Sequence, residues 1–197
     1  MTIDPLWSIS PVDGRYASQT EELSAYFSEG ALIRYRLKIE TEYFIALCRL
    51  PLPQLRGVTD ADCTKMRETF CQEFAPADAE RVKEIEKITN HDVKAVEYLM
   101  KEKFAEIGLE AYKEFIHFGL TSQDINNTAT PLLLKEAHEN ILKPLLISVI
   151  IELEKKAAEW ENIPMLARTH GQAASPTRLG KEIRVFTERL KQQLRLL

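Results

Sequence analysis

The sequence predicts an all-α fold, with an N-terminal helical domain over about residues 1–110 and the first long helices of a central helical bundle over about 111–197. Three observations support this prediction. Glycine is scarce, at 7 of 197 residues. No alternating strand pattern persists, and apolar residues recur at helical three- and four-residue steps. The composition, 45% hydrophobic and 28% charged, is ordinary for a globular protein.

Composition also excludes several classes of function. The net charge of −4 argues against a broad nucleic-acid-binding surface. No apolar run reaches bilayer length, and residues 1–5 lack the pattern of a secretory signal. The three cysteines show no Cys-x-x-Cys spacing, and the four histidines are too dispersed for a local zinc motif. We therefore expect a cytoplasmic protein without a structural metal, and without nucleic-acid or membrane partners.

The first half of the chain divides at turn and helix-end signals. Residues 1–20 read as irregular, with a turn at Asp13-Gly14. A helix over about 21–50 should end before Pro51. A second helix is expected near 60–74, and Pro76 suits the first turn of a third that runs to Ile88.

The second half contains longer helices. Apolar residues from Val93 to Ile107 share one helical face, and Gly108 is a suitable stop. A short helical stretch over 111–119 precedes a long helix over about 124–160, which Pro144 should kink.

The last helix is expected after a loop between Ile163 and Ser175. Ser175-Pro176 carries a helix-start signal, and a leucine-rich stripe then continues to Leu197. Because the stripe stops in mid-pattern, we expect a fragment whose apolar faces are covered by other helices in an oligomer.

Three polar segments interrupt these helices. The first is Thr89–Asp92, the second is Thr121–Asp124 and the third is Arg168–Gln172. In the first two, a Thr precedes an Asp by three residues, which resembles a capping box. A helix start exposes free N–H groups that bind anions, and a histidine beside it can transfer a proton. The pattern favours a site that holds an anion and moves a proton.

Each candidate has a structural alternative. Ser10–Tyr16, here called the N-terminal turn, either presents Arg15 and Tyr16 to an anion or is a solvated surface turn. His91 either serves a site or is an exposed residue of a capped helix start. His170 is either catalytic or a structural loop residue. A packed role is favoured for His117, and His138 is expected to face solvent without a role.

Four motifs together resemble those of the adenylosuccinate lyases, a family within the fumarase and aspartase superfamily. The motifs are Ser10–Tyr16, Thr89–Glu97, Thr121–Asn127 and Arg168–Gln172. The first two motifs favour this family over argininosuccinate lyase, fumarase and aspartase.

The resemblance implies an enzyme that eliminates fumarate from adenylosuccinate to give AMP. It also implies the same elimination from succinylaminoimidazole carboxamide ribotide, which gives aminoimidazole carboxamide ribotide in purine biosynthesis. The family needs no cofactor, and its members are helical homotetramers whose active sites combine segments of three subunits.

The resemblance also implies roles for residues of this sequence. His170 corresponds to the general acid, and His91 assists in orientation or protonation. Arg15 and Tyr16 would hold the nucleotide phosphate, and Thr121 and Ser122 a carboxylate of the succinyl group. The remaining residues expected to line the site are Asn90, Asp92 and, as a weaker candidate, Gln172.

One family element is absent from the 197 residues. The mobile loop that carries the serine base normally lies beyond this point. The resemblance therefore implies a portion of the enzyme that is inactive by itself. Two other interpretations stay open: another lyase of the superfamily, such as argininosuccinate lyase, and a helical scaffold without chemistry.

Overall fold

A computed structural model describes residues 5–197, and the expected helical fold is confirmed. Within the described residues the only sheet is a two-stranded hairpin. Contacts divide the chain into two compact units, and the boundary between them in the sequence falls between Glu136 and Ala137. The domain boundary expected near residue 110 stays a prediction.

The first unit is built from helices joined by short turns. Its α-helices are α1 (Ser24–Phe27), α2 (Glu29–Cys48), α3 (Asp60–Arg67), α4 (Pro76–Thr89), α5 (Asp92–Glu106) and α6 (Ser122–Ala137). The 3-10 turns are Pro5–Trp7, Ala17–Gln19, Glu21–Leu23, Pro53–Leu55 and Glu110–Phe115, and one π-helical turn spans Glu68–Gln72.

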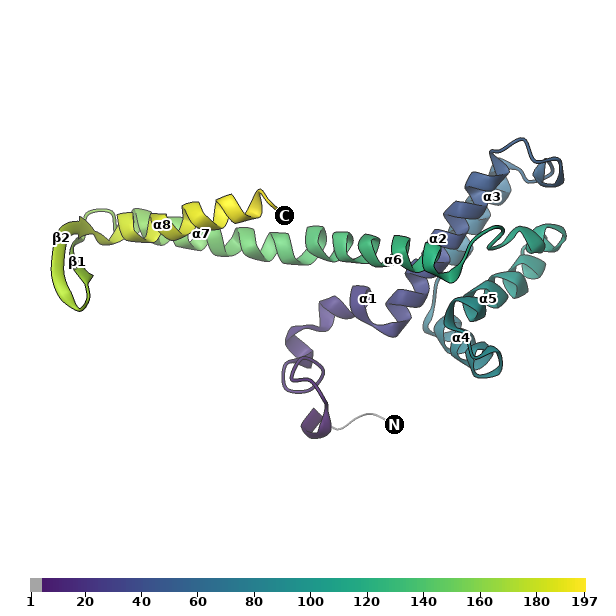
Figure 1. The fold of residues 1–197 in the computed structure, drawn as a ribbon, viewed down its shortest axis with the longest axis horizontal. Coiled ribbons are helices and arrows are strands. Elements are labelled where there is room, and N and C mark those ends of the chain that lie inside the picture. Colours follow the sequence, from purple (N-terminus) through teal and green to yellow (C-terminus); the bar gives the residue numbers. More distant parts are fainter. Residues whose placement is uncertain (1–4) are drawn as a thin grey trace. The chain divides into compact units, whose positions relative to one another are not determined.

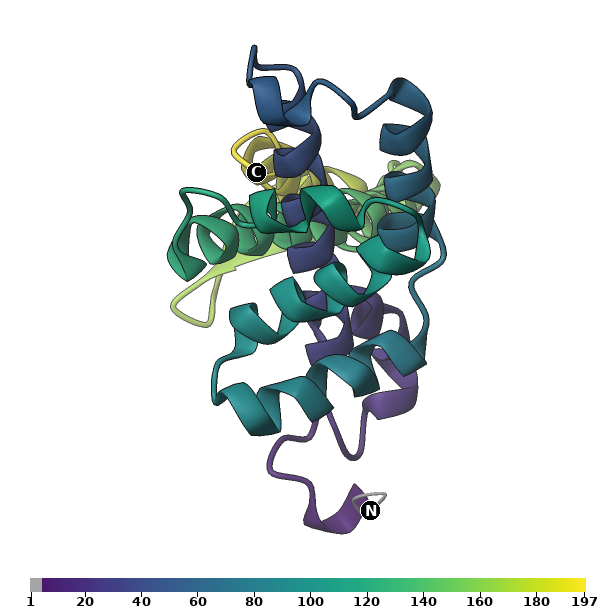
Figure 2. The same cartoon turned by 90° about the vertical axis from the view of Figure 1, so that its right-hand side faces the viewer.

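Helix α2 is the central element of this unit. In Figure 2, α4 and α5 lie side by side and pack across α2. Phe44 of α2 meets Phe104 of α5 edge-on, with ring centroids 5.1 Å apart, and both rings are fully buried. Phe70 packs against Phe104 from the π-helical turn, at 5.9 Å. This aromatic core holds α5, and with it the first polar segment, against α2.

Local signals placed some of these elements correctly. Pro76 begins α4, and Gly108, at φ +81°, follows α5. The prediction of one helix over 21–50 is wrong in one respect, because the helix is interrupted at Ser28, which has extended backbone. The Ser28 hydroxyl accepts a hydrogen bond from Ala31 N at 3.1 Å and caps α2. The stretch expected over 111–119 is a 3-10 turn, Glu110–Phe115.

The long helix expected over 124–160 is realised in three parts. Helix α6 is followed by a π-helical turn, His138–Leu142, and then by α7 (Lys143–Glu159). The helical run from Ser122 to Glu159 is continuous, and its π-helical distortion lies directly before Pro144, as the proline predicts. The wider π turn relieves the clash between a proline ring and the carbonyl four residues earlier.

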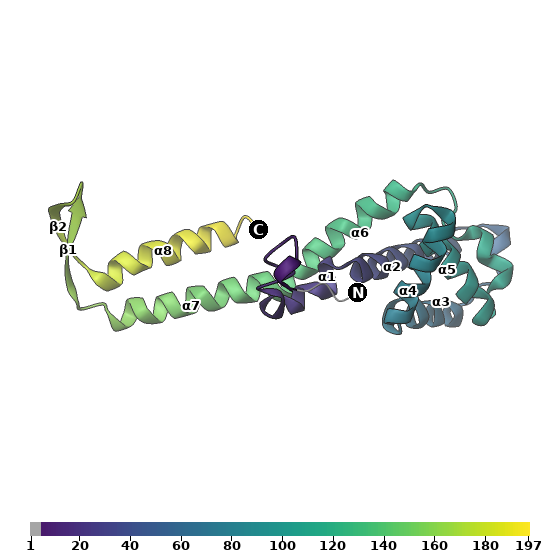
Figure 3. The ribbon, with the colours of Figure 1, turned by 90° about the horizontal axis from the view of Figure 1, so that it is seen from below.

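The second unit is a pair of helices joined by a β-hairpin. Helix α7 and helix α8 (Leu179–Leu194) run side by side, and strands β1 (Pro164–Thr169) and β2 (Gln172–Arg178) lie at one end of the pair (Figures 1 and 3). Lys191 of α8 forms an ion pair with Glu154 of α7. Several large apolar side chains of α7 remain exposed: Leu145, Ile147, Val149 and Ile151.

The hairpin corrects the prediction for residues 163–178. Ser175 and Pro176 lie in β2, and α8 begins only at Leu179. Pro176 pairs with Leu166 beside an irregularity in the ladder. In a two-stranded sheet both strands are edges, so a proline without an N–H is tolerated there. Among residues 5–197 we find no helix with the length and apolarity needed to cross a bilayer.

Candidate active site

The N-terminal turn presents two side chains at the surface. Gly14 N donates a hydrogen bond to Ser10 O at 3.1 Å, and Gly14 is buried beneath the turn. Arg15 and Tyr16 are exposed, with the guanidinium carbon 5.8 Å from the centroid of the Tyr16 ring. The expected pairing of a cation and a phenol is therefore present, and both groups are open to a ligand.

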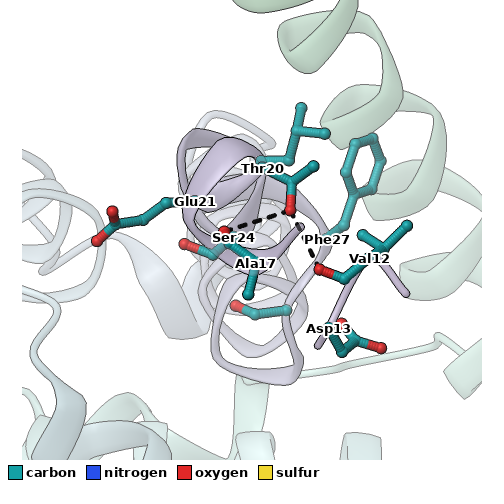
Figure 4. Close-up of a pocket in the computed structure, with 9 residues that line it drawn as sticks. Val12, Asp13, Ala17, Thr20, Glu21, Ser24 and Phe27 are labelled. Atoms are coloured by element: carbon teal, nitrogen blue, oxygen red, sulfur yellow. Dashed lines mark hydrogen bonds between the residues drawn. The ribbon is translucent and has the colours of Figure 1, made fainter. Parts of the chain in front are cut away.

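A cavity of 380 Å³ lies beside this turn (Figure 4). Val12 and Phe27 line it, and the Thr20 hydroxyl lies 3.3 Å from Val12 O and 3.4 Å from Ala17 O. The side chains of Arg15 and Tyr16 are not part of its lining. The cavity is thus next to the expected phosphate-binding pair but does not contain it.

The first polar segment is capped differently from the expectation. Thr89 is the last residue of α4, and its hydroxyl donates to His91 O at 3.2 Å. Asn90 has left-handed backbone, at φ +52°, which ends α4. His91 is the N-cap of α5, and its Nδ1 accepts a hydrogen bond from Lys94 N at 3.2 Å. The capping box expected between Thr89 and Asp92 is wrong, because the turn at Asn90 moves the cap to His91.

The cap defines the chemistry that His91 can offer. Because Nδ1 accepts a hydrogen bond, the neutral ring carries its proton on Nε2. The side chain is 50% exposed, so this Nε2–H can donate to a bound ligand. Protonation of Nδ1 would break the cap.

Asp92 pairs with a buried arginine. Its Oδ2 accepts a hydrogen bond from Arg36 Nη2 at 2.6 Å. Burial acts to raise the pKa of Asp92, but the N–H of Val93 and the Arg36 guanidinium outweigh it and hold the pKa below its ordinary value. Asn90 lines a shallow cavity of 390 Å³ together with Lys83, Glu86 and Lys87.

The second polar segment has one of the two hydrogen bonds of the expected capping box, the one in which the Asp124 carboxylate accepts from the backbone N–H of Thr121. Thr121 N and Thr121 Oγ1 both donate to Asp124 Oδ2, at 2.7 and 2.9 Å. These bonds lower the pKa of the exposed Asp124 carboxyl. Ser122 is half-buried at the start of α6, and within the described residues its hydroxyl has no hydrogen-bond partner. That hydroxyl remains available to a ligand.

We expect Asp124→Asn to lower the thermal stability of the full-length protein at neutral pH by a few degrees. The lowered pKa means that the folded state favours the ionised carboxyl. Its contribution is complete above the ordinary value of 3.8 and is lost as the pH falls through the lowered pKa. Melting curves of the two proteins should therefore differ at neutral pH and converge in acid.

Asp60→Asn is the matched control for this variant. Asp60 is an exposed acid in the first turn of α3 without a side-chain bond to a cap residue, so the same change of charge should cost less. Equal losses in the two variants would show that the Thr121 bonds contribute nothing.

A buried pair lies near this segment, and the sequence predicts only one of its two members, the packed His117. His117 Nδ1 lies 2.5 Å from Oε1 of Glu40, which is 1% exposed. Burial raises the pKa of Glu40, and the hydrogen bond with His117 offsets this only in part. His117 has left-handed backbone, at φ +59°, and its bond to Glu40 links the loop before the second polar segment to α2. The packed role expected for His117 agrees with its 16% exposed side chain, but the sequence does not indicate that Glu40 is its partner.

The third polar segment forms the tip of the β-hairpin. His170 and Gly171 have φ values of +51° and +77°, and Thr169 pairs with Gln172. Two positive φ values in a two-residue loop are typical of a type I′ turn. His170 is exposed, and within the described residues its ring makes no hydrogen bond. The two-residue turn between paired strands restricts the position of the His170 backbone, and with it the position of the imidazole.

The candidate residues thus fall in both units. The hairpin tip, with His170 and Gln172, belongs to the second unit, and the other candidates belong to the first. Within residues 5–197 no group of three or more His, Cys, Asp or Glu side chains is arranged to hold a metal ion.

Comparisons with known proteins agree with these motifs. Residues 14–197 match a family model described as Lyase. The chain is 53% identical over 197 residues to adenylosuccinate lyase of Dictyostelium discoideum, and 44% identical over 194 residues to that of Vibrio cholerae. Each alignment covers 98% of this chain but 42% of the relative. The chain therefore spans less than half the length of these relatives.

Solved structures share the fold. A fumarate lyase from Mesorhizobium superposes with a TM-score of 0.69 and 24% identity, over 88% of this chain and 38% of that protein. A β-carboxy-cis,cis-muconate cycloisomerase from Acinetobacter calcoaceticus gives 0.67 and 19%, over 91% and 41%. At these identities the likeness establishes the architecture alone.

Proposed function

The chain belongs to the lyase family, and we propose that it forms the N-terminal part of an adenylosuccinate lyase. The observation that carries this proposal is the 53% identity to an adenylosuccinate lyase across 98% of the chain. The full-length enzyme would release fumarate from adenylosuccinate, giving AMP, and from succinylaminoimidazole carboxamide ribotide. It would act as a cytoplasmic homotetramer and need no cofactor.

The reaction needs three kinds of group. A base removes a proton from the carbon next to a carboxylate, hydrogen-bond donors stabilise the resulting negative charge, and an acid protonates the departing nitrogen. We assign the acid to His170. Its exposed ring and its support on a two-residue turn favour this role, since a general acid must be held at a defined position.

The remaining candidates bind and orient the substrate in this proposal. His91 would donate its Nε2–H to negative charge, because its Nδ1 is occupied by the helix cap. Arg15 and Tyr16 would bind the phosphate, and the hydroxyls of Thr121 and Ser122 a carboxylate. Asn90, Asp92 and Gln172 would complete the lining.

The test is fumarate release by the purified full-length protein. Adenylosuccinate should be converted to AMP and fumarate, and a purine nucleotide should raise the melting temperature because it binds only the folded state. Turnover of argininosuccinate instead would favour another lyase of the superfamily. No turnover of either compound would favour a scaffold.

A further inference from the structure

One buried arginine connects the first two polar segments. Arg36 lies in α2 and is 5% exposed. Its Nη2 donates to Asp92 Oδ2 at 2.6 Å, and its Nε donates to Asn126 Oδ1 at 2.9 Å. Asp92 is the first residue of α5, and Asn126 lies in the second turn of α6. A single planar guanidinium therefore bonds to the beginnings of two helices.

The two residues that bond to Arg36 are close along the chain to candidate substrate-binding residues. His91 immediately precedes Asp92 in the chain. Ser122 precedes Asn126 by four residues and shares its helical face. The guanidinium has fixed planar geometry, so two bonds from it restrict both distance and direction between the helix starts. Neither Asp92 nor Asn126 can shift without losing a bond to the same group.

We propose that Arg36 is a positioning residue that holds His91 and Ser122 at the separation the substrate requires. The inference rests on the proposed function. Arg36 does not itself contact substrate, because its side chain is 6% exposed and its bonds are directed to Asp92 and Asn126. It acts through the two helix starts.

Arg36→Met removes one partner of an ion pair, and such a change is costly where the remaining charge stays buried. Here the remaining carboxyl of Asp92 is 44% exposed, so water can solvate it after the guanidinium is lost. Met has a similar length to the apolar part of the Arg36 side chain and can fill its place. Arg36→Met should therefore leave a folded protein while it frees the two helix starts.

The experiment compares Arg36→Met with Arg67→Met in the full-length enzyme. Arg67 of α3 makes a bidentate ion pair with Glu42 of α2, at 2.6 and 2.7 Å, and this pair does not include a residue of the polar segments. We expect Arg36→Met to lower kcat/KM for adenylosuccinate by about 100-fold, the effect of misplacing site groups by roughly 1 Å. Arg67→Met should match the wild type, and Arg36→Lys, which retains charge without the planar fork, should be intermediate.

A double-mutant cycle separates positioning from general damage. If Arg36 acts through His91, the loss in Arg36→Met combined with His91→Ala should be smaller than the product of the two single losses. Independent losses, or a folded Arg36→Met enzyme with the kcat/KM of the Arg67→Met control, would overturn the proposal. Should Arg36→Met fail to fold, Asn126→Ala removes only the link to α6, and wild-type turnover in that variant would overturn it equally.

Hydrogen exchange keeps this inference distinct from the proposed function. In Arg36→Met, amides at the starts of α5 and α6 should exchange faster together, and Arg67→Met should leave both unchanged. If the wild type turns over no adenylosuccinate but the exchange pattern is found, the proposed function fails and the coupling of the two helix starts stands. Unchanged exchange at both starts would refute the coupling.

Discussion

Replacing His170 with Asn is expected to lower kcat of the full-length enzyme by a factor of about 100 to 10,000, the usual contribution of a general acid. Asn is the informative substitution because position 170 has positive φ and is followed by Gly171. Asn-Gly is a favoured pair in type I′ turns. The hairpin should therefore fold as before, and only the proton donor is lost.

The measurement is steady-state fumarate release, with circular dichroism to verify the fold. His138→Asn is the matched control, since His138 lies in the π-helical turn before α7 and has no proposed role. It should retain wild-type kcat. If both variants retain it, His170 is not the acid, and the assignment of the third polar segment to catalysis fails.

Replacing Gly180 with Ala is expected to destabilise the full-length protein by about 3 kcal/mol, at the upper end of ordinary overpacking. A Cβ at this position would lie 2.2 Å from the carbonyl oxygen of Ala157 and 2.8 Å from Cα of Glu161. Both are backbone atoms of the segment at the end of α7, so no side chain can move aside. The helices α7 and α8 would have to separate at the end that carries the hairpin.

Gly30→Ala is the control for this variant. Gly30 lies in the first turn of α2, and the nearest atom to its added Cβ is Ser28 Oγ at 3.9 Å. That change should be neutral or stabilising by about 0.4–1 kcal/mol, because it restricts the unfolded chain. Thermal or denaturant unfolding measures both variants. If Gly180→Ala and Gly30→Ala have the same free energy of unfolding, the close approach of Gly180 to the backbone of α7 does not contribute to stability.

The elements predicted correctly are those with signals in their own sequence. Pro76 opens α4 because its ring suits a first helical turn, and Gly108 ends α5 because it adopts positive φ. Candidate site residues were found in the same way, from short polar segments at helix ends. The break at Ser28 and the cap at His91 were missed, because several neighbouring residues could have served as caps.

The hairpin was missed because its local sequence fits two structures. Ser175-Pro176 is typical of a helix start, yet these residues pair with β1. The choice depends on the turn at His170-Gly171 and on the packing of Gly180 against the end of α7. Neither pairing nor packing can be deduced from a period of apolar residues.

The sequence by itself determined the helical class, the family resemblance and the residue types that a site of this chemistry needs. Tertiary structure alone decided which of them meet. Arg36 reaches Asp92 across 56 residues and Asn126 across 90, and Glu40 reaches His117 across 77. Helical periodicity indicates which face a side chain occupies, whereas its partner depends on how separate helices pack.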